Sequence, residues 1–216
     1  MIDIHAWLEV FCGQLEKTFS GRVWFTGLQG SYARGEAKDT SDIDIVVILD
    51  KLTVKDLAAY REMLDGLPER EKICGFVSGR DELMHWEASE LFQFCHDTTP
   101  IKGTLDEVLA LVSDEAVNRA VLAGACNVYH GCVHNFLHER DSAILEGLCK
   151  ASRFVIQASY FRDTGRYVRS HRELSALVSH EEREILCPDY SLGIDELSEK
   201  LFLWAGRKIT GTKNEA

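Results

Sequence analysis

A glycine-serine turn and two acidic side chains are the residues of this chain whose types and spacing suit chemistry. Gly30 and Ser31 follow one apolar run, and Asp42 and Asp44 lie two residues apart where another run begins. A turn led by glycine lets backbone N–H groups approach an anion closely, and a serine hydroxyl adds a donor. Two neighbouring carboxylates repel each other, and a divalent cation relieves that repulsion. The pattern therefore predicts a phosphate at the turn and a metal ion at the aspartates.

The apolar runs on either side of these residues are expected to be strands. The first run, residues 23–28, is short and favours β structure, and it ends at the turn. A helix beginning at Ser31 would therefore direct its free N–H groups toward a bound phosphate. In the second run, residues 42–49, alternation along the strand places Asp42 and Asp44 on the same face. Mg²⁺ is the expected ion, because it commonly takes one or two carboxylates together with substrate phosphates.

The order of these features resembles a known signature. Gly-Ser-Tyr-Ala-Arg-Gly at residues 30–35, followed by Ser-Asp-Ile-Asp at residues 41–44, is similar to the signature of the polymerase-β-like nucleotidyltransferase superfamily. The length of the chain suggests the small-molecule branch, which includes kanamycin nucleotidyltransferase. The resemblance implies that the glycine-serine turn holds the triphosphate of ATP or another nucleoside triphosphate. It also implies that the two aspartates are catalytic residues that bind Mg²⁺.

Arg34 is the remaining candidate for nucleotide binding in this segment. A guanidinium group can contact a phosphate, or it can support the turn by pairing with a nearby carboxylate. The sequence leaves both roles open.

The resemblance further implies a third carboxylate on a following strand, acting as a metal ligand or as the base for an attacking hydroxyl. The candidate strand is residues 72–78, and its middle carries Cys74 and Gly75 instead of an acid. If the third acid is missing, the chain could still bind metal and nucleotide, while chemistry slowed by about 10²–10⁴-fold. Acidic residues elsewhere that could supply this group are Glu71, Asp81, Glu82, Glu139 and Glu146.

Composition limits the partners. The chain has 24 basic and 35 acidic residues and a formal net charge of −11, which argues against nucleic acid and favours a cationic acceptor. Seven cysteines, an odd number without the spacing of a zinc site, indicate buried free thiols in a reducing cytoplasm. No apolar run approaches the roughly 18 residues that cross a membrane. We therefore expect a cytoplasmic protein that has neither nucleic-acid nor membrane partners.

The sequence pattern predicts two domains. Residues 1–105 alternate strand-like and helical patterns, which predicts an α/β nucleotidyltransferase domain with a mixed sheet flanked by helices. Residues 106–216 show long helical periodicity, which predicts an all-α helical bundle domain for substrate binding or interaction. Residues 97–103 are expected to form a turn, whose Lys102 either reaches a phosphate or is solvated. Single helices are expected near residues 81–95, 171–186 and 195–208.

The leading hypothesis is an enzyme that moves AMP from Mg-ATP to a hydroxyl of a small molecule, with an aminoglycoside-like antibiotic as the acceptor. One alternative is a protein hydroxyl, as in minimal AMP-transferring antitoxins that act on a helical toxin partner. Another is a nucleotide-binding module with little catalysis, which the missing acid at Cys74 would explain. The sequence leaves open whether the chain forms a homodimer in which the second subunit completes the cleft.

Overall fold

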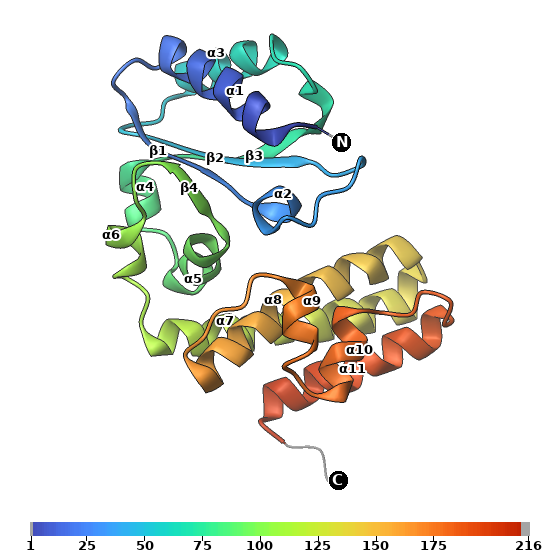
Figure 1. The fold of residues 1–216 in the computed structure, drawn as a ribbon. Helices are drawn as coiled ribbons and strands as arrows, with labels where there is room; N and C mark the ends of the chain where they lie inside the picture. Colours follow the sequence, from blue (N-terminus) through green and yellow to red (C-terminus); the bar gives the residue numbers. More distant parts are fainter. Residues whose placement is uncertain (1, 213–216) are drawn as a thin grey trace. The chain divides into compact units, whose positions relative to one another are not determined.

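The structure, a computed structural model, describes residues 2–212 of the chain. It divides into two compact units, Met1–Leu111 and Val112–Ala216 (Figure 1). The first unit combines a sheet with helices, and the described part of the second unit is helical. This architecture confirms the predicted fold class. The division falls six residues after the boundary expected from sequence, because helix α6 (Asp106–Leu109) packs against α5 (Ala88–Asp97) of the first unit.

A four-stranded mixed sheet forms the centre of the first unit, with strand order β3-β2-β1-β4. Strand β1 runs antiparallel to both β2 and β4, and β2 runs parallel to β3. A short 3₁₀ turn, η1 (Arg70–Lys72), leads into β3. The strands are β1 (Val23–Leu28), β2 (Ile43–Leu49), β3 (Ile73–Gly79) and β4 (Thr99–Lys102).

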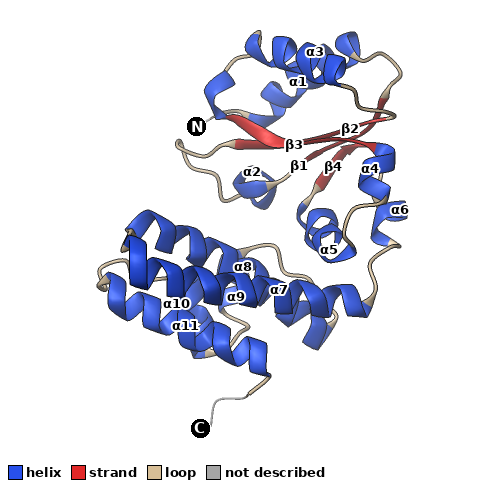
Figure 2. Cartoon of the chain, turned by 180° about the vertical axis from the view of Figure 1, so that it is seen from behind, coloured by secondary structure: helices blue, strands red, loops and turns tan. Residues whose placement is uncertain are grey.

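Helices cover both faces of this sheet. Figures 1 and 2 show α1 (Ile4–Thr18) and α3 (Val54–Asp65) on one face, and α2 (Gly30–Arg34), α4 (Arg80–Met84) and α5 on the other. The core under α1 and α3 takes every second residue of β2, together with the apolar side of α1. These buried residues include Trp7, Phe11, Leu15, Ile43, Ile45, Val47 and Leu49. Alternation along β2 therefore turns its second residue, Asp44, toward the face that carries α2.

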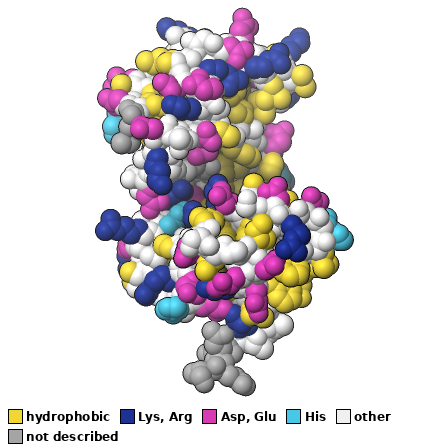
Figure 3. Space-filling model, turned by 90° about the vertical axis from the view of Figure 1, so that its right-hand side faces the viewer, with side chains coloured by type: hydrophobic (Ala, Val, Ile, Leu, Met, Phe, Trp, Pro, Cys, Tyr) yellow, Lys and Arg dark blue, Asp and Glu magenta, His cyan; other side chains and the backbone are white. Residues whose placement is uncertain are grey.

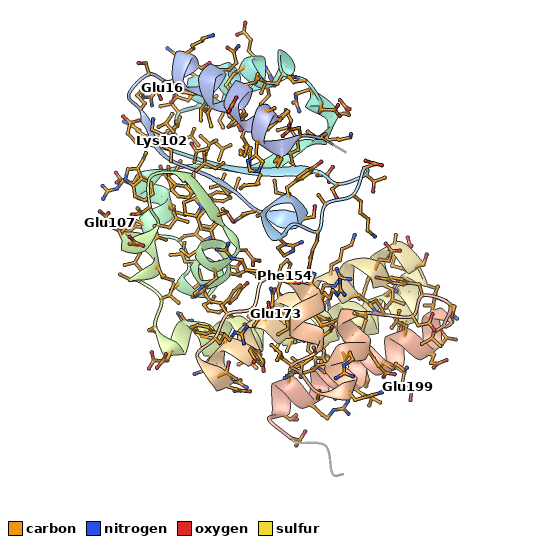
Figure 4. All side chains as sticks on the ribbon, viewed as in Figure 1. Glu16, Lys102, Glu107, Phe154, Glu173 and Glu199 are labelled. Carbon is orange, nitrogen blue, oxygen red and sulfur yellow. The ribbon has the colours of Figure 1, made fainter. Side chains whose placement is uncertain are left out.

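The predicted turn at residues 97–103 is wrong, since it contains β4. Thr99 and Pro100 pair with the end of β1, and an edge strand tolerates a proline because one side of it needs no ladder hydrogen bond. Lys102 is the last residue of β4 and not part of a loop, and its Nζ lies 2.9 Å from Glu16 Oε2 of α1 (Figure 4). Its contact with a phosphate stays a prediction.

Two of the predicted helices are each divided. The helix expected near residues 81–95 is α4 followed by α5, and the one expected near residues 171–186 is α9 (His171–Ser175) followed by α10 (His180–Leu186). In the second case Ser179 restarts the helix, because its side chain accepts a hydrogen bond from the N–H of Glu182 in a capping box. Hydrophobic spacing continues across such a break, so spacing alone does not reveal it.

Three long helices organise the second unit (Figure 2). They are α7 (Asp114–His134), α8 (Ser142–Thr164) and α11 (Ile194–Thr210), and α7 packs against both of the others. The last of them lies where the sequence predicts a final helix. A π-helical turn, η2 (Asn135–Glu139), follows α7. This packing confirms the predicted helical bundle.

All seven cysteines are free, as predicted, but they are not uniformly buried. The buried thiols are Cys95, Cys132 and Cys149, and the exposed ones are Cys74, Cys126 and Cys187. None of the helices in the described part of the chain has both the length and the apolar content that crossing a membrane requires.

Candidate nucleotide and metal site

The glycine-serine turn joins β1 to the five-residue helix α2. Helix α2 starts at Gly30, one residue before the predicted start, and ends where Gly35 adopts the left-handed conformation with φ of 70°. Within the described residues no side chain caps the start of α2, because the Gln29 amide donates instead to Thr98 Oγ1 at 2.7 Å. The first N–H groups of α2 are therefore donors available to an anion.

Gly30 and Asp44 lie directly against each other. The backbone N–H of Gln29 donates to the carbonyl of Asp44 at 2.8 Å, which ties the turn to the start of β2. A Cβ atom placed on Gly30 would lie 1.8 Å from Asp44 Oδ2, and Gly30 has a φ of +66°. Only glycine allows this approach at this backbone conformation. The turn thus brings a predicted phosphate-binding residue to a predicted metal ligand.

The two aspartates influence each other electrostatically. Asp44 is half-buried at the second position of β2, and Asp42 is exposed just before the strand. Burial raises the pKa of Asp44, the negative charge of Asp42 raises it further, and the positive charge of Arg34 lowers it. The two carboxylates are thus close enough for the charge of Asp42 to act on Asp44. A cation held between them would relieve both the repulsion and the cost of burying the charge.

Arg34 lies at the end of α2 with most of its side chain covered. Its Nε donates to Glu36 Oε2 at 3.2 Å, and the Arg34 side chain is 15% exposed. This geometry corresponds to the second of the two predicted roles, in which the guanidinium pairs with a nearby carboxylate and supports the turn. Its positive charge still reaches Asp44, since it lowers the pKa of that carboxyl.

The donor set fits a magnesium ion that is completed by its substrate. Within the described residues there is no group of three or more His, Cys, Asp or Glu side chains that could hold a metal ion. Asp42 and Asp44 supply two hard oxygen donors, and the free N–H groups of α2 would hold phosphates beside them. Mg²⁺ suits such a site because it binds through one or two carboxylates, water and substrate phosphates.

Strand β3 shows what stands in place of the expected third acid. Cys74 is paired in register with Asp44 on the neighbouring parallel strand, so both side chains leave the same face of the sheet. The Cys74 side chain is exposed and its thiol is free. Gly75 cannot supply the acid, because a Cβ there would lie 1.9 Å from the carbonyl oxygen of Ile45. The position beside Asp44 thus carries a thiol instead of a carboxylate.

The other acidic candidates lie in different elements. Glu71 is exposed in η1, at the same end of the sheet as the two aspartates, because β3 begins beside the start of β2. Asp81 and Glu82 belong to α4, which follows the opposite end of β3, about 16 Å along the strand from Cys74. Glu139 lies in η2 and Glu146 in α8 of the helical unit, and their part in the site stays a prediction.

Two supporting residues were not predicted from the sequence. Gln29 and Thr98 link the phosphate-binding turn to the residue before β4, and Thr98 is almost fully buried. The sequence offered no signal for this link, because residues 97–103 have the composition of a turn and the pairing that brings them to β1 is distant in the chain.

The fold and this arrangement of residues agree with a known class of protein. Residues 15–102 match the family model described as the nucleotidyltransferase domain, and this range contains the turn, both aspartates and β3. The match confirms the predicted resemblance and indicates that the chain is a transferase enzyme. No curated protein matches the chain.

A solved structure has a similar fold. It is the crystal structure of spectinomycin adenyltransferase AAD(9) from Enterococcus faecialis with ATP and spectinomycin. The similarity has a TM-score of 0.54 and covers 91% of this chain and 98% of that chain, with 14% sequence identity. At this identity the comparison establishes a shared fold.

Proposed function

We propose that the chain transfers AMP from Mg-ATP to a hydroxyl group of a small-molecule acceptor. The observation that carries this proposal is the contact of Gly30 with Asp44, with Asp42 close enough to affect the charge of Asp44. This contact puts a donor-rich turn and a pair of carboxylates at one place. A nucleoside triphosphate and its metal ion need that combination.

Each part of the site has a role in this transfer. The first N–H groups of α2 and the hydroxyl of Ser31 would donate to the terminal phosphates, and Asp42 and Asp44 would hold Mg²⁺. When bound, the ion would offset charge that develops on the phosphate oxygens. The acceptor hydroxyl gives up its proton to a base or to water, its oxygen forms a bond to the α-phosphorus, the bond from that phosphorus to the bridging oxygen breaks, and pyrophosphate leaves. The residues of this chain therefore act by positioning the triphosphate.

The acceptor class rests on charge and on the fold. An acidic chain with a net charge of −11 attracts a polycation such as an aminoglycoside. The structure with a similar fold contains ATP and spectinomycin, which supports a small antibiotic as the type of molecule to test first. We therefore place an aminoglycoside-like hydroxyl ahead of a protein hydroxyl.

A second candidate function is nucleotide binding with little turnover. The specific observation that favours it is Cys74, which stands in register with Asp44 where the resemblance implies a third acid. A thiol there is a poor substitute for a carboxylate as a base toward a hydroxyl or as a ligand of Mg²⁺.

Incubation with ATP labelled at the α-phosphate distinguishes these functions. The purified chain is given Mg²⁺ and one acceptor at a time: spectinomycin, an aminoglycoside panel, or a cell extract. We expect label on a small molecule, and none with the Asp42→Asn variant. Label on a protein would favour the alternative acceptor. Saturable ATP binding without transfer to any acceptor would favour the binding module.

A further inference from the structure

Three histidines follow one another at intervals of four residues where α7 passes into the turn η2. His130 and His134 belong to α7, and His138 belongs to η2. All three side chains are exposed. Figure 3, in which histidine is cyan, shows side chains of this type on the surface of the helical unit. Neutral imidazole is a common ligand of zinc, copper and nickel ions, so this run of histidines is a candidate metal site.

The distances between the rings select one pair of these histidines. The ring centroids of His134 and His138 are 5.1 Å apart, and those of His130 and His134 are 6.4 Å apart. A ring nitrogen binds such an ion at about 2.0–2.1 Å, which puts the ion about 3.2 Å from the ring centroid. Two rings that bind one ion at a near-tetrahedral angle therefore have centroids about 5 Å apart. The pair of His134 and His138 has this spacing, and the pair that includes His130 does not.

The π-helical turn explains the difference between the two spacings. In an α-helix, four residues overshoot one full turn by about 40°, so His134 is rotated away from His130. A π turn has more residues per turn than an α-helix, so the same interval brings His138 back over His134. The N–H of Arg140 donates to the carbonyl of Asn135 at 2.8 Å, which closes this wider turn. Asn135 is fully buried, so the turn that aligns the second pair is anchored in the unit.

A carboxylate lies beside one nitrogen of the first ring of this pair. Glu139 Oε1 is 3.4 Å from His134 Nε2, and both side chains are about half exposed. Histidines that bind metal ions usually donate their other ring N–H to a carboxylate or a carbonyl, which fixes the tautomer and the orientation of the ring. With its Nε2–H directed toward Glu139, His134 offers Nδ1 to an ion. This contact is independent of the spacing between the rings, and it points to the same use.

The pair supplies two ligands, and water supplies the others. The described part of the chain contains no group of three or more His, Cys, Asp or Glu side chains that could hold an ion. An ion on two histidines therefore keeps open positions, which a further ligand can take. The surrounding charge favours a cation, because the chain is acidic and because the nearby Arg140 is paired with Asp195 at 3.1 Å.

We propose that His134 and His138 bind one divalent transition-metal ion of the zinc, nickel or copper class, and that Glu139 orients His134. The ion exchanges two of its water molecules for the two ring nitrogens. Imidazole selects these metals, whereas Mg²⁺ and Ca²⁺ prefer oxygen ligands. The site is separate from the magnesium site proposed above, because all three of its residues belong to the helical unit.

Calorimetric titration with Ni²⁺ tests this proposal on the full chain, prepared without an added histidine tag. Excess Mg²⁺ is present throughout, because it occupies carboxylates such as those of Asp42 and Asp44 and leaves imidazole free. We expect saturable binding of Ni²⁺ with a Kd below about 1 mM in spite of the Mg²⁺. Zn²⁺ should compete with Ni²⁺ for the same site, since imidazole binds both metals.

Single variants assign the role of each residue. His134→Gln and His138→Gln each remove one ligand and should weaken Ni²⁺ binding by about tenfold or more. Glu139→Gln keeps the size of the side chain but removes its charge, and it should weaken binding by about tenfold. His130→Gln is the matched control, because it replaces an exposed histidine one turn earlier on α7. It should change the affinity by less than about twofold.

Three results would overturn the proposal. They are an equal loss of Ni²⁺ affinity in His130→Gln and His138→Gln, Ni²⁺ binding that His134→Gln does not alter, and the absence of saturable binding below about 1 mM. All four of the replaced side chains are exposed, so the variants should keep the fold, which circular dichroism and Tm without Ni²⁺ verify.

Discussion

At Gly30, the Asp44 carboxylate occupies the space that a side chain at this position would need. The glycine has a positive φ and lies against Asp44, and Gly35 at the other end of α2 also has a positive φ but has nothing within 4 Å of a Cβ placed there. A side chain at Gly35 would therefore cause backbone strain alone, whereas a side chain at Gly30 would cause the same strain and also collide with Asp44.

Gly30→Ala and Gly35→Ala should have different effects on nucleotide binding. Both variants should lose about 1–2 kcal/mol of unfolding free energy, because alanine is strained at their positive φ. Only Gly30→Ala should also lower the affinity for Mg-ATP, by about tenfold or more, since its methyl group displaces the Asp44 carboxylate. Urea unfolding and ATP titration measure the two effects. Equal ATP affinity in the two variants would contradict the proposed contact.

The ionised side chain of Asp44 should lower the stability of the folded chain. Burial and the charge of Asp42 raise the pKa of Asp44, so the folded chain holds a proton there more tightly than the unfolded chain does. The ionised carboxylate therefore lowers stability at pH values above its raised pKa, and this penalty disappears as the pH falls through it. Without Mg²⁺ at pH 8, Asp44→Asn should raise Tm by about 1–3 °C, and the gain should shrink in acid.

A scanning calorimetry comparison supplies the control for that prediction. Asp65→Asn removes an exposed carboxylate that pairs with Arg70 at 2.8 Å, so it should leave Tm unchanged or slightly lower it. A lower Tm for Asp44→Asn than for the unmodified chain at pH 8 would show that the buried charge is stabilising.

At the scale of elements, the parallel pairing of β2 with β3 decides which side chain stands beside the metal ligands. The register Asp44 to Cys74 places a thiol there, and Gly75 has no room for a side chain. A single substitution at Cys74 therefore introduces the expected acid on β3. A neutral residue of similar size at the same position is the control.

Cys74→Asp should raise the rate of AMP transfer, by up to about 10²-fold, because it places a third carboxylate beside Asp44. Cys74→Asn, which adds similar bulk without charge, should not raise it. The rate is measured with labelled ATP and the best acceptor from the panel. If Cys74→Asp is no faster than Cys74→Asn, the base comes from another element or is not needed.

The sequence predicted elements well where local pattern decides and less well where distant pairing decides. Alternation along β2 leaves Asp44 outside the core that holds Ile43 and Ile45, and Asp42, just before the strand, lies close enough for its charge to act on Asp44. Strand β4 was missed because its pairing with β1 outweighs the turn-forming character of Pro100. The contact of Gly30 with Asp44 follows from the closing of the sheet, and no local pattern contains it.

At the scale of the whole molecule, charge is the property that bears on the acceptor. A net charge of −11 attracts cations over distances that dissolved salt shortens. The KM for a polycationic acceptor should therefore rise by about 3- to 10-fold when ionic strength increases from about 0.05 M to about 0.5 M, while kcat changes little. Steady-state rates with saturating Mg-ATP measure this effect. A KM that is independent of salt would argue against electrostatic attraction of the acceptor.

The central claim is that Asp42 and Asp44 hold a magnesium ion against a triphosphate bound at the Gly30 turn. Calorimetric titration of ATP with and without Mg²⁺, on the unmodified chain and on the Asp42→Asn, Asp44→Asn double variant, tests it most directly. We predict that Mg²⁺ strengthens ATP binding to the unmodified chain by about tenfold or more and that the double variant loses this gain. A double variant that retains the full magnesium-dependent gain would contradict the account.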